Sequence, residues 1–237
     1  MPAKPEFPDV VAGTAVLLLA RLRPAHWPWG WSRIAFSRWL PEKANGLRFM
    51  KTLGSGRDGG FGLAPSASHQ GLFCIFSDLA TANDFIAGSP LVRRYRARSD
   101  ECLLMTLAPS TSRGSWDGVG LAAGEPVPQG APVAALTRAS IRPLSAPAFW
   151  RHAPGAQRDL AQADGCEIAI GLGEAPLLRQ ATFSLWRNAN AMNAYARTGA
   201  HQDAIRAAWQ HRFFSESMFV RFSPSSVQGS WNGRRYG

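Results

Sequence analysis

"GSWDG" at residues 114–118 returns as "GSWNG" at residues 229–233, so one Trp-centred pentapeptide occurs twice, 115 positions apart. The match is longer than five residues, because 105–118 aligns with 220–233 without a gap. Self-similarity at a fixed spacing indicates an internal repeat. Three further matches occur in the same order along the chain: 76–83 with 183–190, 20–24 with 139–143, and Leu53-Gly54 with Leu172-Gly173. We therefore predict two copies of one unit, 1–118 and 133–237, joined by a Pro/Gly-rich linker at 119–132 and forming one compact domain.

The second copy shows the order of elements within the unit most clearly. Its apolar patterns predict strands at 132–142, 166–173, 179–186 and 216–224. Helices are predicted at 145–164, with an interruption at Pro154-Gly155, and from the capping residue Asn188 to about residue 210. The first copy repeats this order, with strands near 14–23, 47–53, 71–77 and 101–108 and helices near 35–44 and 81–97.

Strand–helix–strand–strand–helix–strand is the ferredoxin-like pattern. The fold class predicted is α+β, with two tandem ferredoxin-like repeats whose sheets close face to face into a barrel within one chain. Other proteins build this "dimeric α/β barrel" by dimerisation. We expect a ligand pocket between the two sheets. We also expect a pseudo-two-fold axis that places Phe76 over Phe183 and Trp116 over Trp231.

Charge and composition limit the classes of function. The chain has 237 residues and a net charge of +10, spread evenly rather than gathered in a tail. The densest basic stretch, "RRYRAR" at 93–98, would point in several directions on a helix, so we interpret it as a solvated helix end rather than a nucleic-acid site. A diffuse positive field also suits an anionic membrane surface, which stays open as an alternative.

Cysteine usage and hydropathy indicate the compartment. The three cysteines, Cys74, Cys102 and Cys166, show no metal-ligand spacing, which predicts a reducing environment without a zinc site. The apolar run at 10–20 is too short to span a bilayer and is interpreted as a buried strand. We therefore expect a cytoplasmic protein with peripheral contact at the inner face of the cytoplasmic membrane.

Two unusual segments admit more than one interpretation. "GSGRDG" at 54–59 matches the dinucleotide fingerprint, but the "GFGLAP" that follows cannot begin a helix. We interpret it as a hairpin loop, with a lid over a pocket as the alternative. "HWPWGW" at 26–31 is predicted to be irregular, either a satellite core beneath a loop or a surface for a hydrophobic ligand or membrane.

The histidines give no catalytic triad or metal cluster by spacing. His201 is the most informative of the five, because on a helix it shares an apolar face with Ile205, Ala208 and Trp209. This pattern alone leaves open a hydrogen-bonded core histidine and a ligand to a cofactor.

Three long stretches resemble the spheroidene monooxygenase family of bacterial carotenoid biosynthesis. They are "FSRWLPEKANGLRFMKTLGSGRDGGFG" at 36–62, "AMNAYARTGAHQDAIRAA" at 191–208 and "FFSESMFVRFSP" at 213–224. The resemblance implies an O2-dependent, haem-containing monooxygenase that places a keto group at C2 of an acyclic carotenoid such as spheroidene. It also implies reduced ferredoxin as the electron donor. The alternative is a non-enzymatic barrel that binds a hydrophobic, terpenoid-like ligand.

With the resemblance added, His201 is the candidate axial ligand of a haem iron. The spacing between matched blocks increases from 107 to 115 along the chain. The second copy is therefore predicted to carry eight additional residues in the stretch that contains His201. Trp209 would line the cofactor, and Arg197 and Arg206 would pair with its propionates. His211 and His152 are the alternative ligands.

Overall fold

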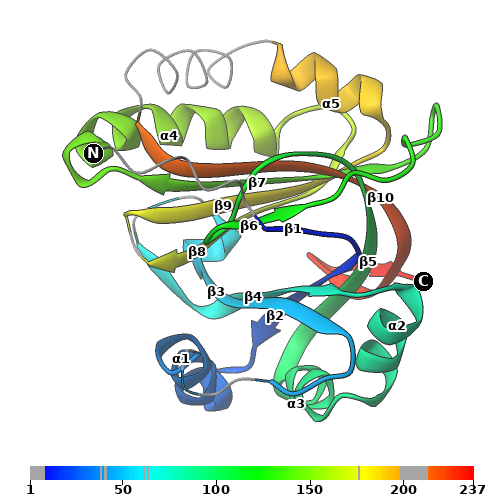
Figure 1. Cartoon of the computed structure of the whole chain (residues 1–237). Helices are drawn as coiled ribbons and strands as arrows, with labels where there is room; N and C mark the ends of the chain where they lie inside the picture. Colours follow the sequence, from blue (N-terminus) through cyan, green and yellow to red (C-terminus); the bar gives the residue numbers. More distant parts are fainter. Residues whose placement is uncertain are drawn as a thin grey trace, which may run out of the picture.

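The chain forms a closed, eight-stranded antiparallel barrel flanked by helices (Figure 1). The computed structural model describes residues 9–237 apart from 38, 40, 41, 61, 63, 176 and 198–212, and describes no side chains at 152–158 and 161. The barrel order is β10-β5-β2-β4-β3-β8-β9-β7, and pairing of β7 with β10 closes it. The strands are β2(Thr14–Leu22), β3(Leu47–Gly56), β4(Pro65–Phe76), β5(Ser99–Gly114), β7(Val133–Ile141), β8(Cys166–Ala175), β9(Arg179–Trp186) and β10(Phe214–Trp231).

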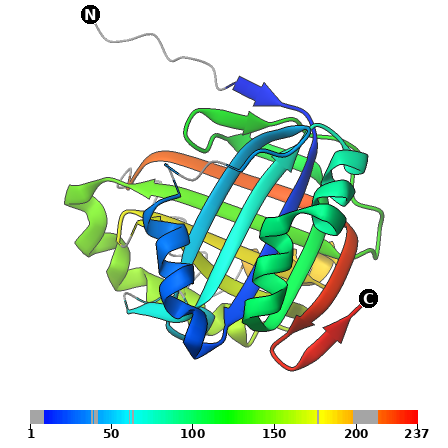
Figure 2. The same cartoon turned by 90° about the horizontal axis from the view of Figure 1, so that it is seen from below.

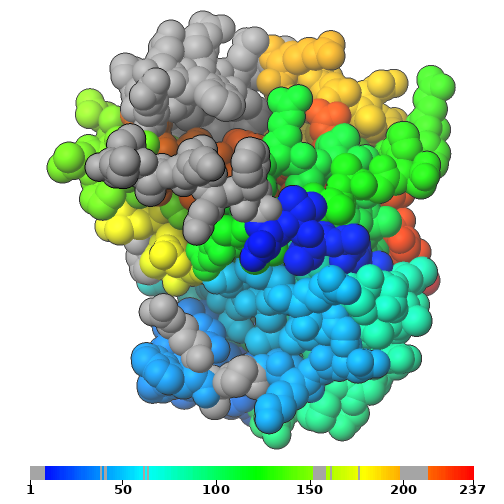
Figure 3. Space-filling view, viewed as in Figure 1, coloured from blue at the N-terminus to red at the C-terminus, as the bar shows by residue number. Residues whose placement is uncertain are grey.

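Each half is one ferredoxin-like unit, which confirms the predicted fold class. The first half has the order β5-β2-β4-β3 and the second the equivalent order β10-β7-β9-β8. Figure 3 shows the halves at opposite ends of the molecule, with the first in blue to teal. The helices are α1(Trp27–Ala35), α2(Leu79–Gly88) and α3(Pro90–Arg98) in the first half, and α4(Ala146–Ala161) and α5(Ala189–Ala196) in the second. Smaller elements are β1(Asp9–Val11), β6(Val119–Leu121), β11(Arg234–Tyr236), η1(Pro24–His26), η2(Arg57–Gly59) and η3(Pro143–Ser145).

Two seams join the halves, and both are symmetric. Across the β5–β10 seam, Gly114 pairs with Met218 and Leu103 pairs with Gly229. Gly229 is the repeat counterpart of Gly114, and Met218 is that of Leu103, so the two pairs are equivalent. Across the β3–β8 seam, Gly54 pairs with its own repeat counterpart, Gly173. A residue that pairs with its own counterpart lies at a two-fold axis. The pseudo-two-fold axis therefore passes through both seams.

The repeated pentapeptides are equivalent turns at the ends of β5 and β10. Asp117 and Gly118 have φ values of 51° and 79°, and Asn232 and Gly233 have values of 51° and 77°. Tight hairpin turns with two positive φ values favour Asp-Gly and Asn-Gly. The tryptophans before them, Trp116 and Trp231, are both buried. The duplicated motif thus encodes the turn that follows the closing strand of each half.

One predicted equivalence is wrong. Thr14 pairs with Phe76 and Val133 pairs with Trp186, so Phe76 corresponds to Trp186, at a spacing of 110. Phe183 instead lies inside the barrel, whereas Phe76 packs outside it against the helices. The sequence alignment of 76–83 with 183–190 was three residues out of register. The second half therefore carries five, not eight, additional residues before β10.

The helix predictions need three corrections. Residues 27–35, not 35–44, form α1, because Pro28 lies in the first turn, where its missing N–H is tolerated, and Gly30 packs directly on the sheet. The predicted helix 81–97 is divided into α2 and α3, since Ser89 caps a new helix that begins at Pro90. Helix α4 continues through Pro154-Gly155 without the predicted interruption.

The barrel interior is a packed core. Inward-facing side chains of both sheets fill it, and the rings of Phe73 and Trp116 stack at 5.5 Å between centroids, with Phe222 at 6.5 Å from Phe73. The ligand pocket predicted between the sheets is therefore occupied by protein. Sites for a ligand have to be sought on the outer faces and at the seams.

Candidate functional site

The outer faces of the two sheets differ in side-chain size. In the first half, Leu18 and Leu72 point outward and are 1% and 0% exposed beneath the helices. Their counterparts in the second half are Thr137 and Thr182, which are half-buried. Both threonines face outward, because their neighbours in the strand lie inside the barrel. We define the small-residue face as Ala135, Thr137, Ala139, Ala169, Gly171, Thr182 and Ser184.

Helices α4 and α5 pack on the outer face of the second sheet. Leu160 of α4 and Met192 of α5 are buried with Val133 and Trp186, where β7 begins and β9 ends. The start of α4 contacts the opposite end of the sheet, where the ring centroids of Phe149 and Phe214 are 5.9 Å apart. The centre of this face, between the two contacts of α4, is lined by small residues.

Of the predicted haem residues, the structure describes Arg197. Arg197 is the C-cap of α5 and is exposed. His201, Arg206, Trp209 and the alternative His211 lie outside the described residues, as does the side chain of His152 in α4. The helix predicted to reach residue 210 is described only to Ala196. The grouping of Arg197 with His201 therefore stays a prediction.

A groove of about 100 Å³ opens at the β3–β8 seam. In the described part of the chain these strands share a single residue pair, Gly54 with Gly173, and beside it the Ser55 hydroxyl donates to the Gly171 carbonyl at 2.6 Å. Trp31 of α1 and Trp150 of α4 wall the groove, and the Trp150 indole N–H donates to the Leu177 carbonyl at 3.0 Å. Other lining residues are Ile34, Ser55, Gly56, Gly62, Pro65, Ser66, Leu172, Glu174, Ala175, Leu177 and Gln180. We call this the seam groove.

The glycine-rich motif at 54–59 contributes to the seam groove. Strands β3 and β4 form an antiparallel hairpin joined through η2, as predicted, and the nucleotide-binding alternative has no helix to begin after the motif. Gly54 and Gly56 line the groove. The tryptophans of "HWPWGW" have different surroundings. Trp29 packs edge-on against Tyr95, with 4.9 Å between ring centroids, while Trp31 faces the groove.

A charged network that the sequence did not predict lies behind the groove. Arg138, which is 1% exposed, occupies an inward position whose counterpart in the first half is Leu19. Its guanidinium contacts Asp117 at 3.3 Å, Glu174 at 3.4 Å and Glu216. Lys51 pairs with Asp117 and, at 3.2 Å, with Glu174. The sequence feature that could have indicated this network is Arg138, a charged residue at an inward-facing position of the largely apolar strand 133–141.

Electrostatics and hydrogen bonds lower the pKa of two carboxyl groups of this network, Asp117 and Glu216. Burial by itself would raise the pKa of Asp117, but the Lys51 ammonium and the Arg138 guanidinium lower it below its ordinary value. The pKa of Glu216 is likewise lowered, because hydrogen bonds from the Gly118 N–H at 2.9 Å and the Ser115 hydroxyl at 2.8 Å outweigh burial. Glu174 accepts from the Trp116 indole N–H at 2.7 Å. With Arg179 included, three cations face three carboxylates, so the network is structural and holds no surplus charge for an ion.

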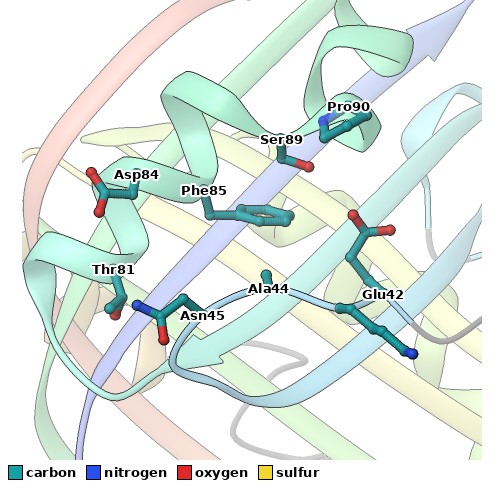
Figure 4. A pocket seen from close by; sticks show the side chains of 9 residues that line it. Glu42, Ala44, Asn45, Thr81, Asp84, Phe85, Ser89 and Pro90 are labelled. Carbon is teal, nitrogen blue, oxygen red and sulfur yellow. The ribbon is translucent and has the colours of Figure 1, made fainter.

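A second pocket, of about 200 Å³, lies in the first half (Figure 4). Glu42, Lys43 and Asp84 line it together with Phe85 of α2 and with Ser89 and Pro90, where α3 begins. Its mixed charges do not suit a hydrocarbon. It lies under the helices of the first half, away from the small-residue face.

The described residues hold no group of three His, Cys, Asp or Glu side chains that could bind a metal ion. The three cysteines are unpaired. Burial raises the pKa of both Cys102 and Cys166 to about 11, so these thiols stay protonated at neutral pH. Within the described segments, no helix has the length and hydropathy needed to cross a bilayer.

The fold places the chain in the class of α+β barrels built from two ferredoxin-like units. An aldoxime dehydratase (OxdRE) crystallised with butyraldoxime is similar in fold, with a TM-score of 0.57, 8% identity, and coverage of 89% of this chain and 79% of that one. A putative monooxygenase from Fusobacterium nucleatum has a TM-score of 0.41 at 7% identity, covering 95% of this chain and 98% of its own. No family model matches the chain.

Two relatives are similar over most of their length. The spheroidene monooxygenase of Rubrivivax gelatinosus is 53% identical over 232 residues, covering 97% of this chain and 90% of the relative. That of Rhodobacter capsulatus is 36% identical over 211 residues, covering 87% and 88%. The chain therefore belongs to the spheroidene monooxygenase family, as the three sequence stretches indicated.

Proposed function

We propose that the protein is a haem-dependent monooxygenase that introduces a keto group at C2 of an acyclic carotenoid such as spheroidene. Membership of the spheroidene monooxygenase family supports an oxygenase. The observation that supports a particular site is the difference between the outer faces of the two sheets. The outer face of the first sheet is filled by bulky side chains beneath its helices, whereas the outer face of the second has small residues at its centre, next to an apolar groove.

The small-residue face fits a flat prosthetic group better than any other described surface. A haem requires an apolar slot and an axial ligand. The barrel interior is filled, and the outer face of the first sheet is covered by bulky buried side chains. Thr137, Thr182 and Gly171 leave the centre of the second sheet without bulky groups.

The residues proposed to hold the haem are those that the sequence analysis identified. His201 is our proposed axial ligand, with Trp209 beside the ring and Arg197 and Arg206 paired with the propionates. Arg197 is exposed at the end of α5, which is compatible with this role. When bound, haem supplies activation of O2. The protein supplies the slot, the orientation of the substrate and the exclusion of water.

The seam groove is proposed to bind one end of the carotenoid. Trp31 and Trp150 offer flat apolar walls, and Gly54 and Gly173 keep the floor open to a linear chain. Gly173 and Gln180 lie both in the groove and at the edge of the second sheet, so the groove leads toward the small-residue face. A carotenoid is much longer than the groove, and only its terminal part would be enclosed.

Electrons are proposed to come from reduced ferredoxin, and the substrate from the membrane. The surplus of 26 basic over 16 acidic residues favours encounter with an acidic electron carrier and with anionic lipid. Both partners would meet the protein from the cytoplasmic side.

A second candidate function is a non-enzymatic carrier of a terpenoid-like ligand. The seam groove favours it, because binding in the groove requires no haem. Absorption spectroscopy of protein expressed with sufficient haem distinguishes the two. A Soret band with one haem per chain supports the oxygenase, and its absence supports the carrier.

The axial ligand is tested by comparing His201→Ala with His211→Ala and His152→Ala. We expect His201→Ala to lose the Soret band and the bound haem, while the other two variants keep both. A normal Soret band and haem content in His201→Ala would reject the assignment.

A further inference from the structure

We propose that the side of the molecule around the seam groove binds an anionic lipid bilayer, so that a carotenoid end passes from lipid into the groove. The delivery of substrate rests on the proposed function, whereas the binding of lipid does not. The described part of the chain has nine exposed large apolar side chains; two of them line this groove, and four more lie in or next to α1 or just before α4. These six are Trp27, Trp31, Phe36, Trp39, Leu144 and Leu177.

The most exposed of these residues come from both halves. Trp39, which is 72% exposed, and Phe36 lie just after α1, with their ring centroids 6.1 Å apart. Leu144, which is 98% exposed, lies just before α4. The Ile141 N–H donates to the Leu178 carbonyl at 2.7 Å, which places the η3 turn beside Leu177 at the groove. Apolar side chains therefore project into solvent from each side of the groove.

The pseudo-two-fold axis explains why these side chains share one surface. The axis passes through Gly54 and Gly173 in the groove, and it relates α1 to α4. Figures 1 and 2 show both helices on the same side of the barrel. A flat bilayer that lies perpendicular to the axis would therefore contact both α1 and α4, with the groove between them.

Basic residues accompany the apolar ones. The repeated Arg-Pro dipeptide places Arg23 before α1 and Arg142 before α4, and both arginines are exposed. Arg151, also exposed, follows the groove residue Trp150. Trp side chains beside Arg are the combination that the headgroup region accommodates, and each arginine adds attraction to anionic lipid. Single projecting side chains with neighbouring cations favour a lipid surface over a flat protein interface.

The test is flotation of the protein with vesicles of phosphatidylcholine with or without phosphatidylglycerol. The triple variant Phe36→Ser/Trp39→Ser/Leu144→Ser avoids residues that line the groove. We expect its partition to phosphatidylglycerol vesicles to fall at least about tenfold. The matched control is Val10→Ser/Leu79→Ser, which removes exposed apolar side chains from other surfaces and should bind as the unmodified protein does. Circular dichroism and thermal unfolding verify that each variant is folded.

Charge is tested with Arg23→Gln/Arg142→Gln. We expect about tenfold weaker binding to phosphatidylglycerol vesicles and no change with phosphatidylcholine alone. Equal binding of the triple variant and the unmodified protein would overturn the proposal. A triple variant that turns a dimer into a monomer without losing vesicle binding would also overturn it, in favour of a second copy on this surface.

Substrate delivery is measured separately. The triple variant should oxidise carotenoid embedded in vesicles more slowly but detergent-dispersed carotenoid at the normal rate. Vesicle binding is measured with and without haem. If binding depends on the three residues but neither substrate is oxidised, the membrane surface stands and the proposed function fails. Equal slowing with both substrates would overturn delivery from the bilayer.

Discussion

The outer faces of the two sheets carry different side chains, although the two halves are copies of one unit. Both halves have the same strand order, and their closing turns are equivalent. The first half buries Leu18, Leu72 and Phe76 beneath α1, α2 and α3, and this packing stabilises the fold. The second half has Thr137, Thr182 and Trp186 at the same positions, and α4 contacts this sheet near both of its ends. One copy fills its outer face with bulky side chains, and the other has small side chains at the centre of the same face.

The largest effect, on haem content and turnover, is expected when the second outer face receives the leucines of the first. In Thr137→Leu/Thr182→Leu, two leucines fill the centre of the small-residue face, so haem content and turnover should fall at least about 100-fold while the protein stays folded. The control Thr137→Val/Thr182→Val keeps the side-chain volume and should retain haem. Haem is measured by its Soret absorbance per chain. Normal haem content in the leucine variant would show that the small-residue face is not the site.

The charged network gives the next largest effect. Arg138→Leu reproduces the residue at the equivalent position, Leu19, but leaves Asp117, Glu174 and Glu216 without their buried partner. We expect a loss of about 3 kcal/mol in the free energy of unfolding, because removing one partner leaves uncompensated charge. Denaturant titration measures it. A loss below about 0.5 kcal/mol, as for an ordinary surface substitution, would contradict the role of the network.

The same network predicts how stability depends on pH. The pKa values of Asp117 and Glu216 are lowered in the folded state, so their stabilising contribution is present at neutral pH, above the unfolded pKa. It is lost as the pH falls through the folded pKa. The difference in stability between the unmodified protein and Arg138→Leu should therefore shrink as the pH falls through the acid range. A constant difference would contradict the ionic origin.

Truncation at matched positions compares the two faces directly. Leu72→Ala opens a cavity in the first half and should cost about 2–5 kcal/mol. Thr182→Ala, at the counterpart position, removes little packing and should cost less than about 1 kcal/mol. Both values come from chemical denaturation. Equal costs would mean that the second face is as tightly packed as the first.

The smallest effect is expected at the seam. A Cβ at Gly54 would lie 3.4 Å from the flexible Cδ1 of Ile34, whereas at Gly173 it would lie 3.1 Å from the Arg179 carbonyl oxygen. Backbone yields less than a side-chain tip, so Gly173→Ala should lower stability by about 1 kcal/mol and Gly54→Ala by less. Thermal unfolding of the pair measures the difference. The reverse order would contradict the seam geometry.

The sequence by itself determined the duplication, the ferredoxin-like order and the two turns, because turn chemistry and strand patterning are local. It also determined the family, through the three stretches that its relatives share. It could not fix α1, since Pro28 and Gly30 are helix breakers in general and are accommodated here by a helix start and a close approach to the sheet. It misplaced Phe183, because a short match cannot fix which face of a strand a residue occupies.

Only the tertiary structure decided where a ligand can lie. Whether Arg138 is solvated or enclosed by three carboxylates depends on strands that are distant in sequence. The contrast between Leu72 and Thr182 has meaning only once the strand registers make them counterparts. The seam groove exists because two glycines meet at an axis that no single segment encodes. Contacts between separate segments set these features, so local pattern alone does not determine them.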